Sequence, residues 1–179
     1  MITDIIKKLI FLLLTFLISL DVIGQVTKKT SVNLNCNWSK IIYDRLHEGA
    51  GGFTLELDLL INTETKFNPK TEVNYSIFSV LEDYRETLEG YPVVSMDHGP
   101  SVFMGLSYNL FKRFNISFSP GICFFNSRTC LAVKPGIELY LDNKKRFPVK
   151  VSLTHIFIND HAGNQPEGYV NIGLGVRLH

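Results

Sequence analysis

The stretch Ser31-Val-Asn-Leu-Asn-Cys-Asn-Trp-Ser-Lys40 alternates between apolar and polar side chains along its whole length. Its apolar residues are Val32, Leu34, Cys36 and Trp38, and asparagines separate them. Successive side chains of a β-strand point to opposite faces, so this segment predicts a strand with one apolar side and one polar side.

Seven further segments repeat this alternation. We predict strands over residues 30–43, 51–61, 71–80, 101–110, 114–125, 128–141, 147–158 and 168–178. A soluble sandwich also uses such strands, but eight of them without an apolar helix favour a barrel with lipid outside and polar groups inside. The predicted fold is therefore all-β, an eight-stranded antiparallel up-and-down outer-membrane β-barrel, with both chain ends in the periplasm.

The beginning of the chain has the features of an export signal. Lys7 and Lys8 precede the apolar run Leu9–Leu20, and small residues up to Gly24 suit cleavage before Gln25. We predict a signal peptide over 1–24 and one barrel domain over 25–179, and the alternative is an uncleaved N-terminal anchor. Export of a barrel implies the cell outer membrane of a Gram-negative bacterium, with barrel-assembly machinery as the partner during insertion.

Composition and motifs exclude several function classes. The net charge of +1 gives no reason to expect a nucleic-acid partner. The chain has no GxSxG, HExxH, CxxC, P-loop or dinucleotide motif, so we expect no cofactor and no metal. Asp97-His98 and Asp160-His161 fall on predicted outer loops, where solvated side chains are a simpler explanation than a cation site.

The alternation also predicts what fills the barrel. The charged side chains expected inside are Glu56, Asp58, Lys134, Glu138, Lys150 and Arg177. Because an eight-stranded barrel is filled by its side chains, we predict an ion-paired plug and no open channel. The aromatic residues expected near strand ends, in interfacial belts, are Trp38, Tyr43, Tyr91, Phe111, Phe147 and Tyr169.

A tight turn at Asn126-Ser127 would place Cys123 directly opposite Cys130. An oxidising compartment allows a disulfide there, although directly opposed strand residues do not always meet its geometry. Cys36 is expected on the lipid face. The other predicted connections are turns at 62–70, 111–113 and 142–146 and outer loops at 44–50, 81–100 and 159–167.

His155 stands out because its parity in the seventh strand matches that of Val151 and Leu153. This parity places an imidazole on the lipid-facing wall near the outer rim, where a polar ring lies at the interface or serves a function.

The segment from Leu153-Thr-His155-Ile-Phe157 to Gly168, followed by the glycine-rich 171–176, resembles the C-terminal part of the lipid A 3-O-deacylases. These PagL-like, or acyloxyacyl hydrolase, outer-membrane enzymes hydrolyse ester-linked acyl chains of lipid A and carry a His-x-Ser-Asn-Ala segment on the penultimate strand. The resemblance implies lipid A as substrate, His155 as the catalytic base and Glu167 as the acid that orients it.

This chain departs from the family at one position, because Phe157 stands where the family has serine. The chemistry is then lost, or His155 activates water directly, or the register near His155 differs. Three function classes follow. They are a barrel related to the deacylases, a non-catalytic OmpX/OmpA-like barrel for surface contact or membrane integrity, and a soluble periplasmic sandwich or lipocalin-like binder of an apolar ligand.

Overall fold

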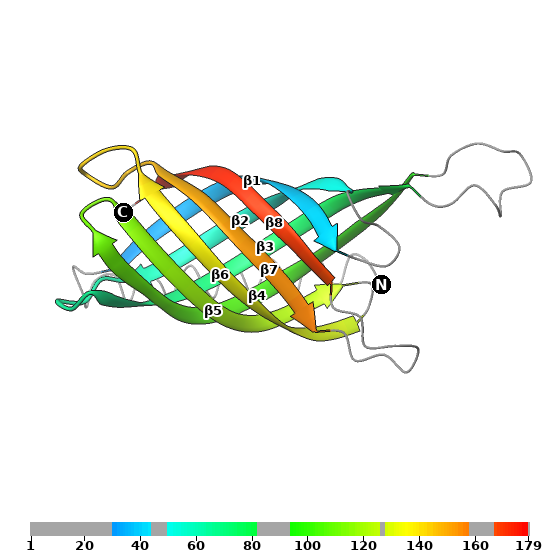
Figure 1. Cartoon of the computed structure of the whole chain (residues 1–179), viewed down its shortest axis with the longest axis horizontal. Helices are drawn as coiled ribbons and strands as arrows, with labels where there is room; N and C mark the ends of the chain where they lie inside the picture. The colour runs from blue at the N-terminus through cyan, green and yellow to red at the C-terminus, as the bar shows by residue number, and fades with distance from the viewer. Residues whose placement is uncertain (1–29, 44–49, 82–93, 126–127, 158–166, 179) are drawn as a thin grey trace, which may run out of the picture. The chain divides into compact units, whose positions relative to one another are not determined.

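The computed structural model describes residues 30–43, 50–81, 94–125, 128–157 and 167–178. The strands are β1 (Thr30–Tyr43), β2 (Gly51–Ile61), β3 (Phe67–Leu81), β4 (Val94–Phe111), β5 (Phe114–Phe125), β6 (Arg128–Tyr140), β7 (Pro148–Phe157) and β8 (Glu167–Arg177). They form a closed barrel in which β8 pairs with β1 (Figure 1). The predicted fold is confirmed, whereas the predicted signal peptide lies outside the described residues.

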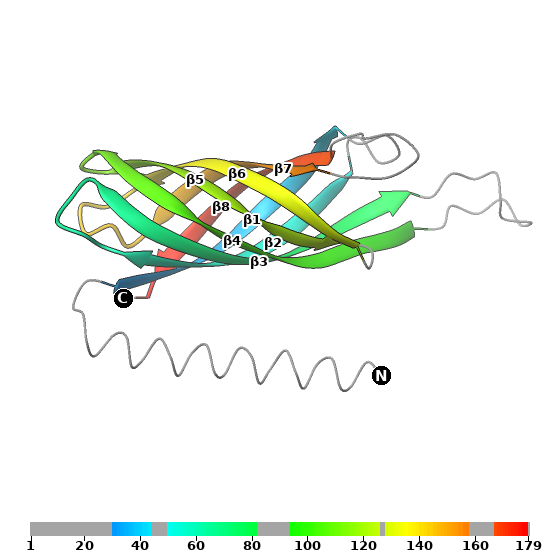
Figure 2. The same cartoon turned by 90° about the horizontal axis from the view of Figure 1, so that it is seen from below.

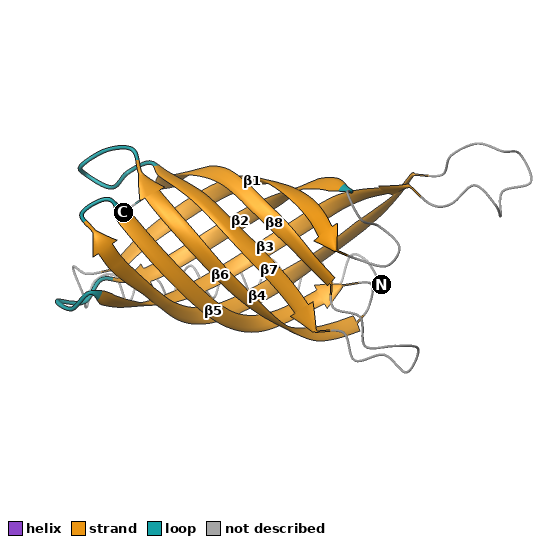
Figure 3. Ribbon diagram, in the orientation of Figure 1, coloured by secondary structure: helices purple, strands orange, loops and turns teal. Residues whose placement is uncertain are grey.

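The wall of the barrel follows the alternation in the sequence. Asn37 is fully buried in the interior, whereas its neighbour Trp38 is 47% exposed on the outside. The register of β5 and β6 is also the predicted one, with Cys123 opposite Cys130, and these two buried cysteines are not joined by a disulfide. Within the described ranges, strands and short connections make up the chain (Figure 3), and no helix is long and apolar enough to span a membrane.

The third and fourth strands are longer than predicted. Phe67–Leu81 pairs with Val94–Tyr108, so residues assigned to the turn at 62–70 and to the loop at 81–100 belong to the sheet. Asp97 and His98 accordingly lie in β4 and not in a loop. The reason is that the alternation continues past both predicted boundaries, with Asn68 and Lys70 buried between exposed neighbours. The two strands extend beyond the others at one end of the barrel (Figure 2).

We call this end the loop end and the opposite end, with the connections 62–66, 112–113 and 141–147, the turn end. In the last connection, the Asp142 carboxylate accepts hydrogen bonds from the backbone N–H of Arg146 at 2.6 Å and of Phe147 at 3.3 Å. Desolvation acts to raise the pKa of Asp142, but these bonds and the Arg146 side chain outweigh it and lower the pKa. The turn contains Lys145 at a positive φ of 55°.

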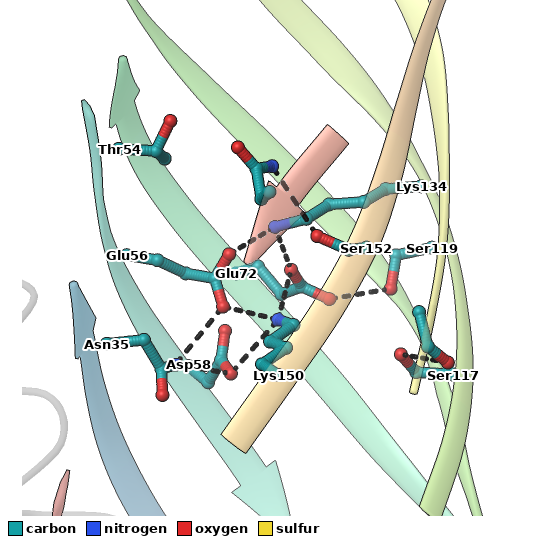
Figure 4. A network of polar contacts seen from close by, with 12 residues as sticks. Asn35, Thr54, Glu56, Asp58, Glu72, Ser117, Ser119, Lys134, Lys150 and Ser152 are labelled. Carbon is teal, nitrogen blue, oxygen red and sulfur yellow. Dashed lines mark hydrogen bonds and ion pairs between the residues drawn. The ribbon is translucent and has the colours of Figure 1, made fainter. Parts of the chain in front are cut away.

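An ion-paired network fills the middle of the barrel (Figure 4). Glu56 binds both Lys134 and Lys150. Lys134 also lies 2.6 Å from Glu72, and Lys70 lies 3.2 Å from Asp58. Five of these side chains are at most 1% exposed, and they are Glu56, Asp58, Lys70, Glu72 and Lys134. Their charges are therefore compensated by one another and not by bulk solvent.

Lys70 and Glu72 are additions to the predicted interior set. The network continues toward the turn end, where Lys70 contacts Glu138 at 3.1 Å and Tyr140 links Glu138 to Arg177 through hydrogen bonds of 3.0 and 2.7 Å. The ion-paired network of the described residues therefore contains four carboxylates and four cations. They are Glu56, Asp58, Glu72 and Glu138, with Lys70, Lys134, Lys150 and Arg177. The predicted plug is confirmed.

The loop end of the interior is apolar instead of charged. Its buried cluster contains Ile41, Phe78, Phe103, Cys123, Cys130, Ala132, Ile156 and Tyr169. Tyr169 packs edge-on against Phe78 with ring centroids 5.0 Å apart, so its assignment to an interfacial belt is wrong. The Lys134 ammonium lies 5.4 Å from the centre of the Phe103 ring, at the boundary between the charged network and this apolar cap.

Candidate functional site

His155 lies on the outer face of β7, two residues before the strand ends at the loop end. Its neighbours Thr154 and Ile156 are buried in the interior, so the predicted outward parity is confirmed. In the sheet, His155 stands between Val133 of β6 and Gly168 of β8. The half-buried imidazole therefore belongs to the surface that faces lipid in a membrane barrel.

Tyr43 of β1 reaches His155 across β8. The Tyr43 hydroxyl lies 2.6 Å from His155 Nδ1, and the two ring centroids are 5.7 Å apart. The contact depends on Gly168, because a Cβ atom there would overlap the Tyr43 ring. It also depends on a register shift between Ile41 and Tyr43, since Ile41 faces inward and the shift turns Tyr43 outward.

Phe157 packs on the other side of the imidazole. The rings meet edge to face, with centroids 4.5 Å apart. Phe157 also borders an apolar groove of about 560 Å³ on the outer wall of β4 to β7. Other residues of the groove are Val102, Met104, Ile122, Leu131 and Val133. The imidazole is thus placed between a phenol on one side and an apolar groove on the other.

Glu167 is not brought to His155. It is the first residue of β8 and not a loop residue, and its partner across the ladder is Ile156, which faces the interior. Alternation therefore places Glu167 and His155 on opposite faces of the wall. The group that the structure sets against the imidazole is Tyr43, which the sequence identified only as a residue near a strand end.

No described serine, threonine or cysteine side chain lies beside His155 as a nucleophile. Ser152 and Thr154 are buried in the interior, as predicted, and Phe157 has no hydroxyl group. Asp160-His161 lies outside the described residues. The closely spaced carboxylates of Glu56, Asp58 and Glu72 do not suggest a cation site, because lysine ammonium groups already bind them (Figure 4).

We predict that Tyr43→Phe lowers the free energy of unfolding by about 1 kcal/mol, the usual contribution of one hydrogen bond. The measurement is urea unfolding in lipid vesicles, followed by the fluorescence of Trp38, the single tryptophan. Tyr108→Phe is the matched control, since this outward tyrosine contacts the Phe67 ring. Equal losses in both variants would contradict a specific role for the bond to His155.

The geometry defines a class of protein. A closed barrel of eight strands with an apolar outer wall, a filled polar interior and short connections at one end is the architecture of the small outer-membrane barrels. No model of a protein family matches the sequence, and no curated protein sequence matches it. The class therefore comes from the three-dimensional fold.

Solved structures with the same fold include the outer-membrane protein Ail of Yersinia pestis in a phospholipid nanodisc, at a TM-score of 0.54 and 12% identity, over 84% of this chain and 100% of Ail. Ail in complex with the heparin analogue sucrose octasulfate gives a TM-score of 0.54 and 15% identity, over 84% of this chain and 98% of Ail. A de novo designed transmembrane barrel gives a TM-score of 0.50 and 7% identity, over 83% of this chain and 95% of the design. These neighbours are consistent with a location in the outer membrane.

Proposed function

We propose that the protein is a non-hydrolysing relative of the lipid A 3-O-deacylases, an outer-membrane barrel whose wall at His155 binds lipid A of the outer leaflet. The observation that supports this proposal is the placement of His155, which Tyr43 holds at 2.6 Å on the lipid-facing wall, directly beside an apolar groove.

The groove and the imidazole are arranged for an acylated lipid. An acyl chain in the groove would lie against Val133 and Phe157, and its ester group would then lie near His155. In the tautomer in which Nδ1 accepts a hydrogen bond from Tyr43, the imidazole carries its proton on Nε2. This N–H is then the donor for an oxygen of the lipid.

The same arrangement argues against hydrolysis. An ester hydrolase of this family needs a hydroxyl group that the imidazole can deprotonate, and the side chain at the required position is Phe157. The aromatic ring fills the place beside the imidazole, and the Nδ1 position that a carboxylate would use is bound to Tyr43 instead. Binding without turnover is what these contacts support.

The test of turnover is the mass of lipid A in cells that lack deacylase activity. We expect the same lipid A mass with an empty vector, with this protein and with His155→Ala. Loss of one hydroxyacyl chain that depends on His155 would overturn the non-hydrolysing assignment. Phe157→Ser is the companion variant, because it restores the residue type of the family next to an intact His155.

The test of binding is the lipid A that co-purifies with the folded barrel. Val133→Trp fills the groove from the lipid side and is expected to reduce the co-purified lipid A several-fold. Leu139→Trp is the matched control, since Leu139 is exposed on the outer face of the same strand but does not border the groove. Equal amounts of lipid A with both variants would contradict binding at this groove.

The filled interior favours one second candidate. Among the described residues, four carboxylates pair with four cations inside the barrel, and such a filled interior does not favour a channel. A non-catalytic OmpX/OmpA-like barrel for surface contact or membrane integrity fits this interior equally well. It predicts that neither Val133→Trp nor His155→Ala changes the lipid that co-purifies.

A further inference from the structure

Two basic side chains interrupt the apolar outer wall. Lys40 of β1 is exposed between the inward-facing Ser39 and Ile41, and His155 of β7 has the same outward direction. Among the described strand side chains, these are the only outward-facing ones of the Lys, Arg, His, Asp and Glu types. The remaining outward positions are apolar or uncharged, so the two basic residues need an explanation.

Barrel closure brings Lys40 and His155 to the same part of the wall. Lys40 pairs with Val170 of β8, and Val170 pairs with Leu153 of β7. Gly168, which separates Tyr43 from His155, lies two residues before Val170, about 7 Å away along the same face. Strands β1, β8 and β7 lie side by side in Figure 1. Lys40 and His155 are also two strand spacings apart, roughly 10 Å. An extended lysine side chain and one phosphate group together can span this separation.

The ammonium group of Lys40 has no described carboxylate on its own face of the wall. The four carboxylates of the ion-paired network are bound by interior cations, on the other side of the sheet. A charge on the lipid face of a barrel costs roughly 2–4 kcal/mol at the middle of the bilayer and much less near its surface. Three residues from the end of β1, Lys40 lies near that surface. The partner that a lipid bilayer offers there is an anionic headgroup.

We propose that Lys40 and Nε2 of His155 together bind one phosphate group of an outer-leaflet lipid. The inference that this lipid is lipid A rests on the proposed function. The arrangement is amphiphilic, because the apolar groove lies on the β6 side of His155 and Lys40 lies on the β1 side. A phosphate at Lys40 and an acyl chain in the groove would therefore belong to the same lipid molecule.

The experiment is native mass spectrometry of the full barrel in detergent micelles, with diphosphoryl lipid A, monophosphoryl lipid A, phosphatidylglycerol and phosphatidylcholine as separate probes. We expect Lys40→Met to weaken retention of diphosphoryl lipid A at least about tenfold, as expected for one charge-assisted hydrogen bond. Lys40→Arg should retain it. Lys112→Met is the matched control, because it removes one exposed lysine at the turn end. Gel mobility verifies that each variant is folded.

The outcomes separate the two proposals. Equal retention of lipid A by Lys40→Met and Lys112→Met would overturn the phosphate site and leave lipid A binding intact. Retention of phosphatidylglycerol that depends on Lys40, without retention of lipid A, would support the phosphate site and overturn the proposed function. Retention of neither lipid by the unaltered protein would overturn both. Binding of inorganic phosphate that depends on Lys40, without retention of any of the lipids, would identify free phosphate as the ligand and contradict the lipid assignment.

Discussion

Glu56→Gln is expected to destabilise the barrel by about 3–5 kcal/mol, the usual cost of removing one partner from a buried ion pair. Glu56 is fully buried and binds both Lys134 and Lys150, and Asn35 donates a hydrogen bond to it at 3.1 Å. Without its charge, the four cations of the ion-paired network face three carboxylates. The cost arises because the unpaired positive charge stays in a region that excludes water.

Urea unfolding in lipid vesicles, followed by Trp38 fluorescence, measures this change. Glu64→Gln makes the same chemical substitution in an exposed turn, and we expect it to change stability by less than about 0.5 kcal/mol. The double variant Glu56→Gln/Lys134→Gln restores neutrality and should recover part of the loss. A Glu56→Gln variant as stable as Glu64→Gln would contradict the role given to the network.

Gly173→Ala is expected to cost about 3 kcal/mol, at the upper end of the range for overpacking a filled interior. Gly173 of β8 lies opposite Asn37 of β1, where the last strand closes onto the first. A Cβ atom at Gly173 would overlap the Asn37 amide oxygen and the backbone carbonyl of Cys36. Because a backbone carbonyl cannot turn away, the seam between β1 and β8 has to open to admit the methyl group.

The same unfolding assay, with gel mobility of unheated samples, measures the folded fraction. Gly51→Ala is the control, since a Cβ atom there has nothing within 4 Å. Gly173→Ala/Asn37→Ala removes one of the two overlapping groups and should recover part of the stability. If Gly173→Ala and Gly51→Ala had equal stability, the seam would be looser than its contacts indicate.

Local alternation was sufficient to predict most of the wall. A period of two assigns every residue of a strand to one face, and the turn that the sequence predicts at Asn126-Ser127 gave the register in which β5 pairs with β6. The predicted strands ended too early at Pro69 and Pro100. Proline lacks the N–H group that a β-ladder normally uses, so it was read as a strand boundary, whereas both prolines lie inside the β3–β4 ladder. Lys70, which follows Pro69, therefore fell outside the predicted strand and was missing from the predicted interior charges. Glu72 lay inside the predicted strand with the inward parity of Asn74 and was missing from the predicted set for no such reason.

The candidate site was predictable only in part for a related reason. His155 followed from parity, which is local information. The position of Tyr43 beside His155 did not follow from parity. Its outward direction depends on a register shift between Ile41 and Tyr43, which the alternation of the sequence does not show. Glu167 was assigned to a loop, whereas its place in β8 opposite Ile156 gives it a definite and unsuitable face. The apolar cap of the interior was also not predicted, since it joins one or two residues from each of seven strands.

The interior charges are divided unequally along the chain. To the ion-paired network, strands β1 to β4 contribute three carboxylates, Glu56, Asp58 and Glu72, and one ammonium group, Lys70. To the same ion-paired network, strands β5 to β8 contribute three cations, Lys134, Lys150 and Arg177, and one carboxylate, Glu138. The barrel thus consists of an anionic half-shell and a cationic half-shell. If one half entered the membrane by itself, its excess of like charge would be buried without a partner. We therefore expect the two halves to close against each other in one cooperative step.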